Sequence, residues 1–185
     1  MRNCLLFVWT MIDPIYYRLT RLQYVPDKHN QRTLFRVRLT KYKGRPIRLQ
    51  DGTVINKNDV LIKIHFHNVK LLSALHPIKN DMKRALCAYK IVKASLPALA
   101  RFIEERYGNC KVKGVIGIST LNRGANQLGF EIFPIRSRVY YNYKCLTFVL
   151  INYLSCKRAI QPPVYLFMSK QQLSTFNREL ERHEM

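Results

Sequence analysis

Acidic residues are scarce in this chain. Its 185 residues include 11 Asp and Glu against 32 Lys and Arg, which gives a formal net charge of +21. A surface of one sign repels itself, so we expect the protein to lie beside a polyanion, such as an anionic lipid leaflet, a nucleic acid or an acidic polymer. The imbalance restricts the class of partner but indicates no reaction.

The cysteines lack the spacing of a disulfide framework or a zinc cluster. There are five, an odd number, and no two of them form a CxxC pair. Reduced thiols are therefore expected, which favours a cytoplasmic location.

Long apolar runs are also missing. Residues 4–12 follow a charged N-terminus as in a signal peptide, but Asp13-Pro14 ends the run and no small-residue cleavage pattern follows. A second run covers residues 145–154. Both are shorter than the roughly 18 residues of a membrane-spanning helix, so we expect shallow insertion at most.

Apolar and aromatic residues are abundant, however. The chain is 48% hydrophobic and contains eleven Tyr, nine Phe and one Trp. This composition is typical of a folded core rather than of a disordered basic tail. Because no repeat or low-complexity linker divides the chain, we predict an amphipathic helical segment over 1–25 and a single α+β domain over 26–185, with an antiparallel or mixed sheet and a long amphipathic helix.

The first half has the pattern of a helix followed by a small antiparallel sheet. Apolar residues recur at helical spacing over 4–24 beside Arg18 and Arg21, and a polar loop follows over 26–33. Alternation from Leu34 then predicts a half-buried strand. Its basic outer face carries Arg36, Arg38 and Thr40.

A hairpin signal comes next. The dipeptide Asp51-Gly52 is among the strongest two-residue turn signals, and we expect strands on both sides of it. The strands predicted in this region are 47–50, 53–55 and 60–66.

A long amphipathic helix is predicted over 80–107, ending at Gly108. Pro97 is expected to kink or divide this helix, with Ser95 as a possible new cap. Strands over 112–119 and 130–135 follow on either side of a short turn or helix, and they lie close enough in sequence to pair.

The last part of the chain contains an ambiguous segment. Residues 138–157 are apolar nearly all round a helical wheel yet rich in strand-forming residues, and we interpret them as a helix. A buried strand over 164–168 precedes a final helix, where Ser169 and Gln172 have the spacing of a capping box.

His65 and His67 are the candidates for a metal site. They stand two apart in a predicted strand, so both side chains project from one face. A site needs further ligands, for which Asp59 or Glu131 can only be nominated. Two hydrogen-bonded histidines at a strand end are the favoured alternative, and no cofactor is predicted.

Glu131 is the single acid between Glu105 and Glu179. An isolated carboxylate in a basic stretch suits a general base or a cation site. The alternative, which we favour, is a structural partner for Arg123 or Arg136.

The polar turn 119–124 is a candidate anion site. Asn122, Arg123 and Gly124 could cradle an anion there, although the cap of a short helix explains the same residues. The chain has no GxxxxGK[ST], GxGxxG or GxSxG motif, so nucleotide cradling and serine hydrolysis lose support. No motif indicates catalysis.

Basic residues beside apolar segments favour an anionic membrane as the partner. Residues 136–178 contain seven bases and no acid around a tyrosine-rich run. The expected membrane contacts are Trp9, Tyr16, Tyr17, Arg18, Arg21 and Lys144. Bases and aromatics also interleave at 41–43 and 140–144, which keeps nonspecific nucleic-acid binding as an alternative.

Several motifs together resemble the YkoP family of Bacillus and its relatives over most of the chain. They lie at residues 13–16, 35–39, 51–53, 58–59, 64–68, 121–124 and 128–131. The family is largely uncharacterised, and a similar module occurs at the C-terminus of some polysaccharide deacetylases. The resemblance implies an accessory function in envelope polysaccharide metabolism. The cysteines and the basic, apolar segments together favour a location at the cytoplasmic face of the membrane.

A fainter likeness concerns the second half of the chain. The stretch 125–130 and the late strand ending at Ser169 resemble the second half of one class of acetyltransferases. The acyl-coenzyme A loop of that class, [QR]-x-x-G-x-[GA], is missing here. An enzyme, either such a transferase or a metal-dependent hydrolase using His65 and His67, therefore remains an alternative to the accessory protein.

Overall fold

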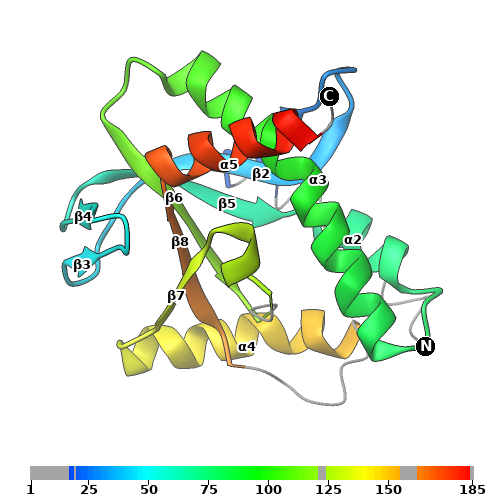
Figure 1. The fold of residues 1–185 in the computed structure, drawn as a ribbon. Helices are drawn as coiled ribbons and strands as arrows, with labels where there is room; N and C mark the ends of the chain where they lie inside the picture. The colour runs from blue at the N-terminus through cyan, green and yellow to red at the C-terminus, as the bar shows by residue number, and fades with distance from the viewer. Residues whose placement is uncertain (1–16, 19, 121–123, 155–161, 184–185) are drawn as a thin grey trace.

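The computed structural model describes residues 17–18, 20–120, 124–154 and 162–183 (Figure 1). Six strands form a mixed sheet in the spatial order β1-β2-β5-β6-β8-β7, and β3 and β4 form a separate two-stranded ribbon. Only β5 and β6 run parallel; the other neighbouring strands are antiparallel. The α+β class, the mixed sheet and the long helix are thus confirmed.

Apart from β1, which is not predicted, the strands lie close to the predicted ranges. The strands are β1 (Gln23–Pro26), β2 (Arg32–Lys41), β3 (Ile47–Arg48), β4 (Val54–Ile55), β5 (Val60–Phe66), β6 (Val112–Ser119), β7 (Glu131–Pro134) and β8 (Val164–Ser169). Gly52, in the turn between β3 and β4, has a φ of 84°, a backbone conformation that glycine adopts without steric cost.

Four α-helices accompany the strands in the described part of the chain, together with a 3-10 turn at Asn126–Leu128. They are α2 (Asn68–Leu75), α3 (Asp81–Tyr107), α4 (Arg138–Leu154) and α5 (Lys170–His183). The crossover between the parallel strands β5 and β6 runs through α2 and α3. No helix within the described ranges has both the length and the apolar character needed to cross a bilayer.

The two faces of the sheet are covered differently. The main core lies between the sheet and the pair α3 and α5, and it includes Val37, Ile64, Val115 and Met168. Figure 1 shows α4 on the other side of the sheet from that pair. On α4's side a smaller core forms around Leu61, Ile116 and Phe167, beneath the β3-β4 ribbon.

The start of the described chain corrects one prediction. The helix predicted over 4–24 lies mostly outside the described residues, and only Tyr17 and Arg18 are seen as helical. By Gln23 the chain is already a strand, because β1 pairs with β2 and Val25 is fully buried. The Thr33 hydroxyl donates to the Val25 carbonyl at 2.8 Å and secures that edge.

The outer face predicted for β2 is also partly wrong. Arg36 is only 1% exposed rather than facing solvent. Its guanidinium lies over the rings of Tyr24 and Tyr17, at 4.7 and 5.4 Å from the centroids, and donates to the Tyr24 hydroxyl at 2.7 Å. Aromatic rings replace part of the solvation that burial removes.

The predicted pairing of β6 with β7 does not occur, since β8 lies between them. Leu166, Phe167 and Met168 are almost completely buried, so β8 needs a neighbour on both edges and both faces covered. A strand that arrives late in the sequence therefore separates two strands that are close in sequence.

Three helices can also be compared with the predictions from the sequence. Helix α2, whose Leu71, Leu72 and Leu75 are buried, is absent from the predicted elements. Helix α3 continues through Pro97 without division, and the Ser95 hydroxyl donates to the Ile91 carbonyl at 2.8 Å instead of capping a new helix. The helical interpretation of residues 138–157 is confirmed over Arg138–Leu154.

A basic, aromatic groove as the candidate functional site

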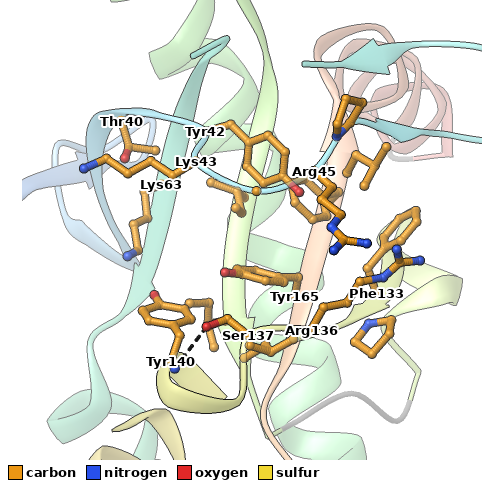
Figure 2. A pocket seen from close by; sticks show the side chains of 18 of the residues that line it. Thr40, Tyr42, Lys43, Arg45, Lys63, Phe133, Arg136, Ser137, Tyr140 and Tyr165 are labelled. Atoms are coloured by element: carbon orange, nitrogen blue, oxygen red, sulfur yellow. Dashed lines mark hydrogen bonds between the residues drawn. The ribbon is translucent and has the colours of Figure 1, made fainter. Parts of the chain in front are cut away.

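A cavity of about 1100 Å³ lies on the sheet face opposite α3 and α5. Its floor comes from β2, β5, β6, β7 and β8, and its walls are the segment 41–48 and the first turn of α4. Figure 2 shows Lys63 and Tyr140 on one side of this space, Arg45 and Arg136 on the other, and Tyr165 between them. We call this cavity the basic groove.

Positive charge dominates the lining. Among the described lining residues there is no Asp or Glu, and seven side chains are cationic: Arg38, Lys41, Lys43, Arg45, Arg48, Lys63 and Arg136. They come from β2, β3, β5 and the loops at 42–46 and 135–137, so the fold gathers charges that are dispersed in the sequence. Part of the net charge of +21 is thus concentrated at one concave site.

Strand register explains why the basic residues of the floor meet. In the antiparallel pair of β2 and β5, Arg38 lies directly opposite Lys63 and Arg36 lies opposite His65. Directly opposed residues project from the same face of a sheet. Four basic residue positions thus share one face of two neighbouring strands.

Neighbouring positive charges lower the pKa values of two lysines beside Arg38. Burial, followed by the charges of Lys144 and Arg38, lowers the pKa of Lys63 to about 8. Burial and Arg38 also lower the pKa of Lys144. In the described part of the chain no carboxylate pairs with any of these three side chains. A bound anion would therefore relieve an existing repulsion.

Arg38 has spare hydrogen-bonding capacity. Its Nη1 donates to the Thr20 carbonyl at 3.4 Å, whereas its buried Nε has no partner among the described residues. Unsatisfied buried donors are costly, and a ligand oxygen is one way to satisfy them.

His65 lies next to this cluster and is uncharged. Burial, and then the charges of Lys63 and Arg38, lowers its pKa to about 3. Its buried Nε2 also has no hydrogen-bond partner in the described ranges. The imidazole is therefore neutral at physiological pH.

Aromatic rings form a continuous row along the groove. Tyr140 stacks on Tyr165 with centroids 6.3 Å apart and planes at 16°, and Tyr165 contacts Phe167 at 5.7 Å. Phe167 in turn forms T-shaped pairs with Tyr42 and Phe133, with ring centroids 5.6 Å apart in each pair. Phe167 is fully buried, whereas Tyr140 and Tyr165 are only partly buried and present apolar ring surface between the cations.

The tyrosine hydroxyls remain protonated. Burial, with smaller contributions from Tyr140 and Tyr42, raises the pKa of Tyr165 to about 12, and burial also raises the pKa values of Tyr42 and Tyr140. Each hydroxyl can therefore donate a hydrogen bond to an anionic oxygen at neutral pH.

The candidate metal ligands are not brought together with a third partner. No group of three His, Cys, Asp or Glu side chains suited to a metal occurs within the described residues. Asp59 lies at the opposite end of β5 from His65, where it pairs with Lys113 at 2.9 Å. His67 precedes α2, and its ring lies edge-on to Tyr24 at 5.8 Å.

Glu131 holds neighbouring segments together. Its Oε1 accepts from the Gln50 backbone N–H at 2.8 Å and from Gln172 Nε2 at 3.2 Å. These contacts join β7 to the β3-β4 ribbon and to α5. Of the two arginine partners that the sequence suggested, Arg123 lies outside the described residues, and no ion pair between Glu131 and Arg136 occurs within the described part of the chain.

The other predicted site residues are spread over the molecule. Asn122, Trp9 and Tyr16 lie outside the described residues, and Gly124 sits in a turn with a φ of 79°, away from the groove lining. Tyr17 packs on Tyr24 at 4.7 Å.

The three basic residues expected at a membrane also lie in different environments. Arg18 and Arg21 are exposed, whereas Lys144 is partly buried. Its ammonium lies 5.4 and 5.1 Å from the ring centroids of Tyr140 and Tyr143. Lys144 therefore belongs to the charged cluster of the groove rather than to the N-terminal contacts.

The groove had one recognisable signal in the sequence. The interleaved bases and aromatics at 41–43 and 140–144 come from distant parts of the chain, and both segments contribute to the groove or to its charge cluster. Arg38, Lys63 and Tyr165 had no such signal, because their convergence depends on strand register.

Residues 2–177 match the family model of the YkoP domain. The chain belongs to the YkoP family. A relative named uncharacterized protein YkoP, from Bacillus subtilis (strain 168), is 40% identical over 177 residues, which are 94% of this chain and 96% of the relative. No solved structure matches the chain, so the likeness of its second half to acetyltransferases stays a prediction.

Proposed function

We propose that this YkoP-family chain is an accessory protein that binds an anionic ligand in the basic groove and catalyses no reaction. The observation that carries the proposal is the lining of the groove, which has seven cationic side chains and no carboxylate among its described residues. The cluster of Arg38, Lys63 and Lys144 supplies an electrostatic reason for an anion to bind there.

The size and chemistry of the groove favour a segment of an anionic glycan. Its volume of about 1100 Å³ lies just above the roughly 300–1,000 Å³ typical of small-molecule pockets. Sugar rings can lie on the faces of Tyr140 and Tyr165, while phosphate or carboxylate groups pair with the cations. Such a ligand agrees with an accessory function in envelope polysaccharide metabolism at the cytoplasmic face of the membrane.

An enzyme is the second candidate, and one observation favours it. A lysine with a pKa of about 8 changes its protonation near neutral pH, as catalytic lysines do. The described lining offers no carboxylate to act with it, and Glu131 is engaged by Gln50 and Gln172. The described groups of the groove are therefore sufficient to bind an anion, whereas a reaction would need a further acid or base beside Lys63. This difference favours binding without catalysis.

The test is a binding titration with fluorescently labelled inorganic polyphosphate as the anionic probe and neutral dextran as the uncharged one. Because two charge-assisted contacts are removed, Arg38→Gln with Lys63→Gln should weaken polyphosphate binding at least about tenfold. The matched control is Lys83→Gln with Lys90→Gln, two exposed lysines on α3 at the other face of the sheet. Equal losses in both double variants would show that diffuse net charge, not the groove, binds the probe.

The pH dependence provides an independent readout. An anion in the groove raises the pKa of Lys63 above its value of about 8 in the free protein, so binding is strongest below pH 8. Affinity should then fall by up to about tenfold per pH unit above pH 8, and Lys63→Gln should remove that fall. A wild-type profile that stays flat to about pH 9.5 would contradict a contact between the ligand and Lys63.

A further inference from the structure

Helix α4 carries an apolar stripe that the protein does not cover. Val139, Tyr143, Leu146 and Val149 are 83%, 55%, 73% and 54% exposed. Their spacing of four, three and three residues places them along one side of the helix. We call these four side chains the α4 stripe.

The packing of α4 differs from that of the other long helix. Of its side chains that the structure describes, 138–149, none is buried, whereas α3 has nine buried residues. Tyr140, which stacks on Tyr165 of the sheet, is itself only partly buried. A helix this rich in apolar residues normally owes its stability to burial of one face, so the stripe is expected to have a partner.

The charges around the stripe indicate what that partner is. The sequence from residue 132 to 178 contains no acid, and Arg136 and Arg138 stand exposed at the start of α4. An apolar strip with a tyrosine, flanked by arginines and lacking carboxylates, is complementary to an anionic lipid surface. A protein partner would more often be matched by charges of both signs.

We infer that the α4 stripe is the surface by which this protein lies on an anionic phospholipid bilayer, with α4 parallel to the membrane plane. The inference rests on the proposed location at the membrane and specifies the contact. Arg136 and Tyr140 line the groove at the same end of α4. The groove therefore opens beside the lipid headgroups, and membrane contact and anion binding are adjacent on the molecule.

The experiment is sedimentation of the full chain with vesicles of phosphatidylglycerol and phosphatidylcholine, compared with phosphatidylcholine alone. Val139→Asn with Leu146→Asn should reduce partitioning to the anionic vesicles at least about tenfold, because two inserted side chains become polar. The matched control is Met82→Asn with Leu86→Asn on α3, since these side chains are 81% and 53% exposed. The control pair should change partitioning less than about twofold.

Two results would overturn the inference. One is vesicle binding by the α4 pair that equals the wild type, and the other is an equal loss in both pairs. If sedimentation velocity instead shows a dimer that only the α4 pair dissociates, with vesicle binding unchanged, a second copy covers the stripe and the inference is wrong. Circular dichroism and the Tm of each variant verify folding.

Polyphosphate binding in solution separates this inference from the proposed function. The α4 pair should keep the polyphosphate affinity of the wild type, because its two positions are not part of the groove lining. Loss of vesicle binding with retained polyphosphate binding supports the inference. Vesicle binding retained by the α4 pair sinks the inference. If the Arg38→Gln, Lys63→Gln double variant loses polyphosphate binding in the same series, the groove proposal stays intact.

Discussion

Arg36 and Lys63 are both withdrawn from water, but their environments differ. Arg36 lies against the rings of Tyr17 and Tyr24 and donates to a hydroxyl, so its charge is partly solvated by the protein. Lys63 instead lies near Lys144 and Arg38. Its pKa is lowered because burial and these positive charges disfavour its protonated form. A poorly solvated cation kept at a concave surface is typical of a binding site rather than of a stabilising contact.

His65 should make the protein sensitive to acid. Its pKa is about 3 in the folded protein against an ordinary value of 6.5, so between those values the unfolded state binds more protons and stability falls as pH falls. At pH 5 this loss amounts to about 2 kcal/mol, since each pKa unit corresponds to about 1.4 kcal/mol. Urea unfolding at pH 7 and pH 5 measures this decrease in the free energy of unfolding. We expect the contribution of His65 in the wild type and its absence in His65→Gln.

The control for this prediction is His76→Gln, at the exposed end of α2. It should retain the acid sensitivity of the wild type. A His65→Gln protein that loses as much stability as the wild type between pH 7 and pH 5 would show that the imidazole is accessible to protons in the folded state.

At the scale of elements, side chains from distant strands hold the β3-β4 ribbon in place. Asp51 accepts a short hydrogen bond from the Ser169 hydroxyl, and Lys113 Nζ donates to the Val54 carbonyl at 2.9 Å. Ser169 also forms the predicted capping box, in which its backbone N–H and its Oγ bond reciprocally with Gln172. The ribbon and the segment before it make one wall of the groove, so these bonds also position the site.

Glu131→Ala should loosen this assembly. The change leaves the Gln50 N–H and the Gln172 amide without their acceptor, which we expect to cost about 1–2 kcal/mol in the free energy of unfolding. Glu131→Gln keeps an acceptor oxygen and should cost less. Urea unfolding measures the cost, and hydrogen exchange at the Gln50 amide should quicken in the alanine variant.

Glu105→Ala, at an exposed position of α3, is the control and should change stability by less than about 0.5 kcal/mol. If Glu131→Ala behaved like that control, Glu131 would not be holding the ribbon.

For the whole molecule, the net charge of +21 opposes the compact state unless counterions or a ligand are present. Between about 50 mM and 500 mM NaCl, screening should raise the Tm by about 2–4 °C for each kcal/mol of repulsion that is relieved. Polyphosphate at equal ionic strength should raise the Tm further, because a ligand that binds only the folded state stabilises it.

The additional rise should disappear in the Arg38→Gln, Lys63→Gln double variant and persist in the Lys83→Gln, Lys90→Gln control. Differential scanning calorimetry provides the measurement. If polyphosphate and chloride raise the Tm of the wild type equally at matched ionic strength, the groove has no preference for a multivalent anion.

The sequence by itself determined the local elements, because they depend on short-range periodicity and capping. β2 follows from alternation, α3 follows from helical spacing, and the turn at Asp51-Gly52 follows from backbone preference. The family resemblance, carried by contiguous motifs, is confirmed for the same reason.

Only the tertiary structure decided where the charges gather. β8 enters between β6 and β7, and the register of β2 on β5 sets Arg38 against Lys63, although 25 positions separate them in the sequence. Such pairings depend on the burial of a whole sheet, not on neighbours along the chain. The net charge therefore follows from the composition alone. The groove that concentrates part of this charge forms only when the strands pair in the observed register.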